Sequence, residues 1–227
     1  MFYTGDMGLY IAVTVLTLVI AGAAQWYVSH QLKKYSHVPS QLGISGAQMA
    51  QRMIIDRNLG PVGLHRGGHG QNHFDPRDNS VTLGPDEYTY GSITAIATAA
   101  HEVGHAEQYA TGYTFMKIRS ALVPVVNLAS NAWFIILLLG LFMGLAGFVK
   151  LAIILFAATL LFQLVTLPVE FDASRRGLAY LQSTGVNAAE LQGATSVLRA
   201  CALTYVAAAL TSLLQLVYLI ISTRSEN

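Results

Sequence analysis

The chain has 227 residues, of which 53% are hydrophobic and only 11% are charged, and its mean hydropathy is +0.48. These values exclude an ordinary soluble domain and predict an integral membrane protein. The formal net charge of +1 gives no electrostatic basis for a nucleic-acid partner.

Four segments lack Asp, Glu, Lys and Arg and are long enough to cross a bilayer, since about 20 apolar residues span a hydrocarbon core of about 30 Å. They are Met7 to Leu32, Ser120 to Val149, Leu151 to Val169, and Ala200 to Thr223. We expect the first to be a retained anchor, because Trp26, Lys33 and Lys34 mark a membrane exit. The third is the shortest and ends beside Pro168, so a tilted or re-entrant segment is an alternative there.

The basic residues predict the orientation of these spans. All of the 13 Lys and Arg residues except Lys150 and Arg224 lie between the first and second spans or between the third and fourth. Four spans bring both of these segments to one face, and basic residues near helix ends favour the cytoplasm. We therefore expect the charged segments in the cytoplasm and both termini outside.

The segment between the first two spans is expected to form a small α+β unit. Ser45 and Gln48 have the spacing of a capping box, which predicts a helix from about Gly46 to Asn58. Three short strands are expected after it, separated by turn-rich stretches. They are Val62 to His65, Asn72 to Asp75, and Ser80 to Leu83.

Residues typical of helix ends predict three further helices. Ser92 can cap a helix that runs to about Ala110. After the third span, Glu170 to Gln182 is expected to be a helix ended by Gly185, and Asn187 can cap a long helix that leads into the fourth span.

The sequence HEVGH at positions 101 to 105 is an HExxH pattern on the helix expected after Ser92. Residues four apart share a helix face, so the imidazoles of His101 and His105 can bind one metal ion. Zinc binds imidazole at about 2.0–2.1 Å, and a catalytic site has three protein ligands and keeps one position for water. Glu102 would be the general base that takes the proton of this water. The pattern predicts a hydrolytic zinc site, with a chance occurrence of HExxH as the alternative.

The third ligand must come from elsewhere in the chain. Gln108 and Thr111 stand where a metzincin would have glycine and its third histidine, which argues against that class. A distant carboxylate is then required. The acidic residues beyond His105 are Glu107, Glu170, Asp172, Glu190 and Glu226.

Glu170 is the leading candidate among these acidic residues, because two spans separate it from the motif and return it to the same face. Glu107 lies on another face of the helix, and Glu226 is expected on the opposite side of the membrane. The alternative for Glu170 is an interfacial carboxylate paired with a nearby arginine.

Three stretches of the sequence are similar to stretches of a known protein family. They are HFDPRDNSVTLG, AAHEVGHAEQYA and LPVEFDASRRGLAYL. They resemble the bacterial membrane-bound neutral zinc metallopeptidases, the YugP-like family, and the resemblance covers about Ser45 to Tyr205. Glu170, Phe171 and Ala173 are more distantly similar to the EF-x-A piece of HtpX-type heat-shock proteases and CaaX prenyl proteases. The Glu of that piece is a zinc ligand, so the resemblance implies that Glu170 completes a site for one zinc ion per chain.

The same resemblance implies roles for other residues. Ser174 stands where those relatives have Asp, so the role of orienting a ligand falls to Asp172 or Ser174. The resemblance also implies that the strand before the motif helix pairs with the substrate backbone as an added edge strand. The residues of that strand are Ser80, Val81, Thr82 and Leu83.

Three residues have weaker functional interpretations. Arg175 and Arg176 are candidates for stabilising the oxyanion of the tetrahedral intermediate, and the alternative is that they hold the chain at the cytoplasmic face. His73 is a candidate for a residue at the border of the active-site cleft.

Gly140 and Gly144 form a GxxxG pattern that predicts close helix packing, within the chain or between copies.

The sequence thus predicts a mostly α membrane protein with four transmembrane helices and a small α+β, zincin-like catalytic unit at the membrane surface. The expected parts are an anchor (1–32), the metalloprotease unit (33–119), a transmembrane hairpin (120–169), the third-ligand helix and connector (170–199), and a final transmembrane helix (200–227).

The expected function is a zinc endopeptidase of the bacterial inner membrane that faces the cytoplasm and cleaves peptides or membrane proteins. One alternative is a catalytically silent zinc-binding scaffold. A transporter fits less well, because the four apolar segments contain no Asp, Glu, Lys or Arg for an ion pathway.

Overall fold

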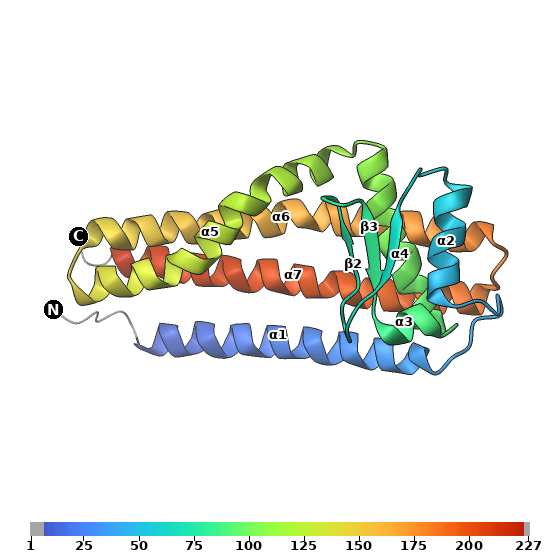
Figure 1. Ribbon diagram of the computed structural model, residues 1–227. Helices are drawn as coiled ribbons and strands as arrows, with labels where there is room; N and C mark the ends of the chain where they lie inside the picture. Colours follow the sequence, from blue (N-terminus) through green and yellow to red (C-terminus); the bar gives the residue numbers. More distant parts are fainter. Residues whose placement is uncertain (1–6, 225–227) are drawn as a thin grey trace. The chain divides into compact units, whose positions relative to one another are not determined.

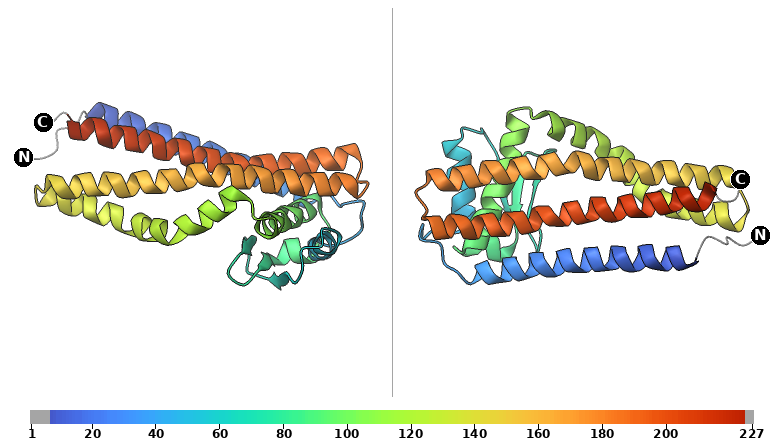
Figure 2. Two further views of the ribbon diagram at one scale, coloured as in Figure 1. Left: turned by 90° about the horizontal axis from the view of Figure 1, so that it is seen from above. Right: turned by 180° about the vertical axis from the view of Figure 1, so that it is seen from behind.

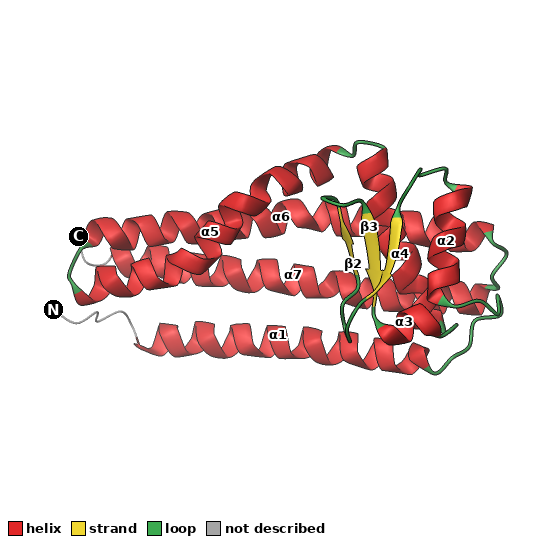
Figure 3. Ribbon diagram, viewed as in Figure 1, coloured by secondary structure: helices red, strands yellow, loops and turns green. Residues whose placement is uncertain are grey.

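The computed structural model describes residues 7–224, and it is mostly helical with one small sheet (Figures 1 and 3). In chain order the elements are α1 (Met7–Ser36), α2 (Gly46–Asp56), β1 (Gly63–Arg66), β2 (His73–Asp75), β3 (Ser80–Leu83), α3 (Pro85–Thr89), α4 (Ile93–Ala110), α5 (Thr114–Phe142), α6 (Ala146–Ser183) and α7 (Ala188–Arg224). The predicted fold class is confirmed. Glu226, which the predicted topology places on the far side of the membrane, lies outside the described residues.

Four helices, α1, α5, α6 and α7, are long and apolar enough to cross a membrane, as the sequence predicts. Of these, α6 and α7 run side by side in every view (Figures 1 and 2). Asn187 caps α7 as expected, because its side-chain oxygen accepts a hydrogen bond from the Glu190 amide at 2.8 Å.

The third span and the helix expected to begin at Glu170 are one continuous helix, α6, which contains Pro168. The expected boundary between them is therefore wrong. Proline removes one backbone hydrogen bond and strains the turn before it, but a helix with enough neighbouring contacts continues through it. The sequence changes from apolar to charged residues at this point, but the helix continues.

The chain forms two compact units, and each long helix contributes residues to both. The helical unit comprises Met1–Gln25, Ile118–Leu167 and Thr204–Asn227, of which the structure describes residues 7–25, 118–167 and 204–224. The sheet unit comprises Trp26–Lys117 and Pro168–Leu203.

Many apolar side chains of the helical unit are exposed at its surface. Leu18, Leu128 and Phe142 are all exposed, Phe142 to 80%. Such surfaces are typical of a protein in contact with lipid, since in water they would form large exposed apolar patches.

The GxxxG pattern in the helical unit serves packing within the chain. A Cβ on Gly140 would lie 2.9 Å from the backbone nitrogen of Val149, so glycine lets α5 and α6 approach closely there. Gly144 has a φ of +67° and forms the turn between the two helices, a conformation that favours glycine.

In the sheet unit, the strand order is β1-β3-β2, with β1 parallel and β2 antiparallel to β3 (Figure 3). Gly63 to Arg66 pair with Ser80 to Leu83 on one side, and His73 to Asp75 pair with Ser80 to Thr82 on the other. The strand Ser80–Leu83 is therefore central, and the expectation that it is an edge strand for substrate is wrong. Its backbone hydrogen-bonding groups are already used by both neighbours.

The core of the sheet unit lies between α2, α4, the sheet and the segments of α6 and α7 that belong to this unit. Its largest fully buried apolar residues are Met49, Met53, Val81, Leu83, Ile96, Val103, Val169, Leu181 and Val197. The predicted capping box of α2 is confirmed, since Ser45 and Gln48 each bond the other's backbone. This packing holds α4 in a fixed position.

We predict that Ile96→Ala destabilises the protein by about 2–5 kcal/mol, because it leaves a cavity in this core. Thermal unfolding in detergent should show a clearly lowered midpoint. The same substitution at Ile55, which is 66% exposed, is the matched control and should have little effect. Equal effects at the two positions would contradict the assignment of the core.

Candidate metal centre

The candidate centre is built on α4, a helix that is buried along most of its length. Ser92 caps it by accepting a hydrogen bond from the Ala95 amide at 3.2 Å, as predicted. His101 and His105 lie one turn apart on the same face, and their ring centroids are 4.7 Å apart at an interplanar angle of 80°.

A carboxylate from α6 faces both imidazoles. Glu170 is only 3% exposed, and its Oε2 lies 3.3 Å from His101 Nε2 and 3.6 Å from His105 Nε2. These three residues form the one group of histidine, cysteine and acidic side chains within residues 7–224 whose ligand atoms converge closely enough for a metal, all within 4.8 Å of one another. The structure thus brings together the three residues that the sequence analysis selected.

The distances from the Glu170 carboxylate to the two imidazoles fit zinc. Ligand bonds of about 2.0–2.2 Å at tetrahedral angles place neighbouring ligand atoms about 3.3–3.6 Å apart. The two measured distances from Glu170 Oε2 lie in this range. Two imidazole nitrogens and one carboxylate oxygen are also a usual donor set of catalytic zinc sites.

Two glycines allow α4 and α6 to approach closely enough for this convergence. A Cβ on Gly104 would lie 2.6 Å from the carbonyl oxygen of Ala173. A Cβ on Gly177 would lie 3.0 Å from the carbonyl oxygen of Ala100. Backbone touches backbone at both places, so the distance from Glu170 to the two histidines is set by helix contact.

The second nitrogen of each imidazole meets a polar side chain. His101 Nδ1 lies 3.1 Å from Ser174 Oγ, and His105 Nδ1 lies 3.0 Å from Gln108 Oε1. With both Nδ1 atoms engaged in this way, both Nε2 atoms face the Glu170 carboxylate. Such hydrogen bonds orient metal-binding histidines.

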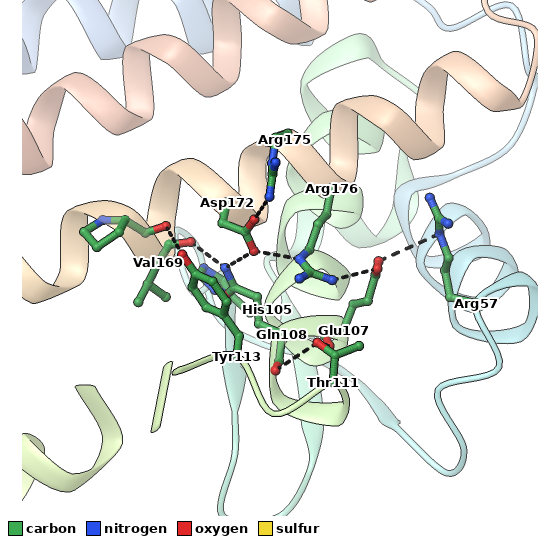
Figure 4. Close-up of polar contacts among 11 residues, drawn as sticks. Arg57, His105, Glu107, Gln108, Thr111, Tyr113, Val169, Asp172, Arg175 and Arg176 are labelled. Atoms are coloured by element: carbon green, nitrogen blue, oxygen red, sulfur yellow. Dashed lines mark hydrogen bonds and ion pairs between the residues drawn. The ribbon is translucent and has the colours of Figure 1, made fainter. Parts of the chain in front are cut away.

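Asp172 lies behind the centre, where it accepts hydrogen bonds from Gln108, Arg175 and Arg176 (Figure 4). Arg176 Nη1 also bonds Glu107 Oε1 at 2.8 Å. The Arg176 guanidinium is therefore held between two carboxylates, whereas the Arg175 side chain is 77% exposed.

Tyr113 lies next to this group, in the loop after α4. Burial raises the pKa of its phenol above the ordinary value, so the hydroxyl stays protonated at neutral pH. The hydroxyl donates a hydrogen bond to the Pro168 carbonyl oxygen at 3.4 Å.

The remaining predicted site residues occupy separate positions. Glu102 is on α4 beside His101 and is only 7% exposed. His73 is exposed on β2, and the metal-binding group does not include it.

Sequence reasoning missed Gln108 as a participant, although its position three residues after His105 places it beside that residue on a helix. It also missed Gly177, whose only sequence feature is its spacing of seven from Glu170. Glu107 was set aside as a ligand, and the structure agrees, since its carboxylate pairs with Arg176 and Arg57 instead.

Comparison with known proteins supports the same assignment. The sequence matches a family profile described as "Putative neutral zinc metallopeptidase" over residues 10–224. It is also similar to the "Putative membrane protease YugP" of Bacillus subtilis (strain 168), with 40% identity over 224 residues that cover 96% of this chain and 100% of that protein. No solved structure matches the chain significantly. The family description implies zinc, for which His101, His105 and Glu170 offer ligands.

We predict that Gly104→Ala lowers the zinc content of the purified protein, because the added methyl group forces the Ala173 carbonyl and its helix away from α4. Elemental analysis should show a loss of bound zinc. Gly147→Ala is the matched control, since a Cβ there meets nothing within 4 Å. Full zinc occupancy in the Gly104 variant would show that the close helix contact is not needed for the site.

Proposed function

Because the chain belongs to the family of neutral zinc metallopeptidases, we propose that it is a membrane endopeptidase with one zinc ion held by His101, His105 and Glu170. The observation that carries this proposal is the convergence of two Nε2 atoms and one carboxylate oxygen from α4 and α6, in which the oxygen lies at zinc-ligand spacing from both nitrogens. Its substrates would be peptides or membrane proteins.

Bound zinc would supply Lewis acidity, which lowers the pKa of a coordinated water and polarises a peptide carbonyl. Glu102, next to His101 in the sequence, would take the proton of the attacking water and return it to the nitrogen of the leaving amine. Its burial keeps bulk water away from this proton transfer. Ser174 and Gln108 hold the two imidazoles from behind.

The two arginines would have different roles. Arg176 is engaged by Asp172 and Glu107, so we assign it to holding α6 against α4. Arg175 bonds only Asp172 among the ion pairs of the described residues and is largely exposed, so it is the better candidate for meeting the oxyanion.

We propose that a substrate strand adds to the edge strand β2 instead of β3. Phe74 of β2 packs against Tyr109 of α4, with ring centroids 5.8 Å apart, which places β2 beside the helix that carries the motif. Main-chain pairing at this edge would bind a peptide without selecting its side chains.

We predict that Glu102→Gln lowers the rate of casein or peptide cleavage by about 100- to 10,000-fold and leaves zinc stoichiometry unchanged, because it removes only the general base. His101→Ala should lose zinc as well as activity. Cleavage assays and elemental analysis of the same preparations test both statements. Unchanged cleavage by the Gln variant would rule out the mechanism, and a wild-type protein that binds zinc but cleaves nothing would favour a silent scaffold.

We also propose that the sheet unit faces the cytoplasm of a bacterial cell, on the distribution of Lys and Arg. To test this, Asp86→Cys, at an exposed position of α3, would be placed in a Cys201→Ser background. The new thiol should react in intact cells with a membrane-permeant maleimide and resist an impermeant one. Labelling by the impermeant reagent would reverse the orientation.

A further inference from the structure

We propose that Gln108 is a positioning residue that fixes which nitrogen of His105 faces the metal and ties that ring to the backbone next to Glu170. The inference rests on the proposed zinc site and deepens it. Its evidence is the set of three hydrogen bonds around one buried amide.

Gln108 is fully buried on α4, three residues after His105. Its Oε1 lies 3.0 Å from His105 Nδ1. Its Nε2 donates to the Val169 carbonyl oxygen at 2.7 Å and to Asp172 Oδ2 at 3.0 Å (Figure 4). Both hydrogens of the amide NH2 group are thus donated in hydrogen bonds.

These partners determine the orientation of the amide. A backbone carbonyl can only accept, and Asp172 Oδ2 is likewise an acceptor, because Arg176 Nε donates to the same oxygen at 2.7 Å. Both partners therefore require the NH2 end of Gln108, since the oxygen end would face two acceptors. The reversed amide would lose two hydrogen bonds in a buried place.

The orientation of the amide in turn determines the tautomer of His105. The Gln108 oxygen can only accept, so His105 Nδ1 must carry the hydrogen. The lone pair of a neutral imidazole is then on Nε2, the atom that faces Glu170 Oε2 at 3.6 Å. Nε2 is then the His105 nitrogen that is available to bind a metal.

The same side chain links two of the proposed ligands. The Val169 carbonyl belongs to the residue just before Glu170, so Gln108 connects the His105 ring to the turn of α6 that carries the third ligand. Asp172 extends this connection to Arg176, and Arg176 extends it to Glu107. A displacement of α6 would be transmitted to the His105 ring through one amide.

His101 lacks a comparable constraint. Its Nδ1 meets the Ser174 hydroxyl, which can rotate and either donate or accept. The two histidines should therefore differ, with His105 the more firmly preorganised. This difference is the feature that an experiment can detect.

The test compares Gln108→Met with wild type in detergent. Methionine keeps a similar volume but provides neither the amide donors nor the oxygen acceptor. We expect the zinc dissociation constant, measured by chelator competition, to rise about 10- to 100-fold. The absorption spectrum of the cobalt-substituted protein should also change, which reports on ligand geometry without any assay of activity.

Tyr180→Phe is the matched control for general destabilisation. It removes a partly buried 2.6 Å hydrogen bond to Asp56 in the same unit but away from the proposed ligands. It should lower the unfolding midpoint and leave zinc affinity unchanged. Wild-type zinc affinity and an unaltered cobalt spectrum in the Gln108→Met protein would overturn the inference.

A rescue variant separates hydrogen bonding from packing. The double change Gln108→Glu with Asp172→Asn keeps an acceptor for His105 Nδ1 and reverses the second hydrogen bond, so that the new amide at position 172 donates to the new carboxylate at position 108, with the total charge conserved. We expect it to regain part of the lost zinc affinity relative to Gln108→Glu alone. No recovery would contradict the hydrogen-bonding account.

If the position 108 variants do not fold, wild-type protein still provides the answer. Histidine nitrogen chemical shifts in the zinc-loaded, 15N-labelled protein report which ring atom carries hydrogen. We expect hydrogen on His105 Nδ1, and hydrogen on Nε2 would overturn the inference. Failure of the wild-type protein to bind zinc would instead contradict the proposed function.

Discussion

The structure depends on direct backbone contact between α4 and α6. Gly104 and Gly177, one on each helix, leave no side chain between them, and the adjoining carbonyls of Ala173 and Ala100 fill the space. Because the two helices touch backbone to backbone, the side chains near this contact have fixed positions relative to one another. Glu170 therefore reaches His101 and His105 without a flexible loop, which reduces the conformational entropy lost on binding an ion.

Much of the fold and of the proposed metal site followed from local rules. Imidazoles four residues apart on a capped helix must share a face, and the scarcity of acidic residues after His105 left few candidates for a third ligand. The capping residues Ser45 and Ser92 likewise act within one turn, so sequence alone is sufficient to predict them.

The features that sequence missed depend on contacts between distant segments. Ser80–Leu83 is central because β1 pairs with it in parallel, although β2 lies between the two in the sequence. The sequences of such short strands do not determine which strands pair. The role of Gln108 requires Val169 and Asp172 to arrive from α6. The continuity of α6 was hidden because Pro168 and Glu170, the first charged residue after the apolar stretch 151–169, both suggest a helix boundary.

The short length of β2 affects which substrate chains such a protein could select. Its three residues, His73–Asp75, present only a few backbone groups along the sheet edge. A polypeptide paired with β2, as proposed above, would be contacted along only a brief extended stretch, and a folded domain keeps such a stretch within its own structure. Discrimination would thus rest on local unfolding, so that damaged or unassembled chains are favoured over intact ones whatever their composition.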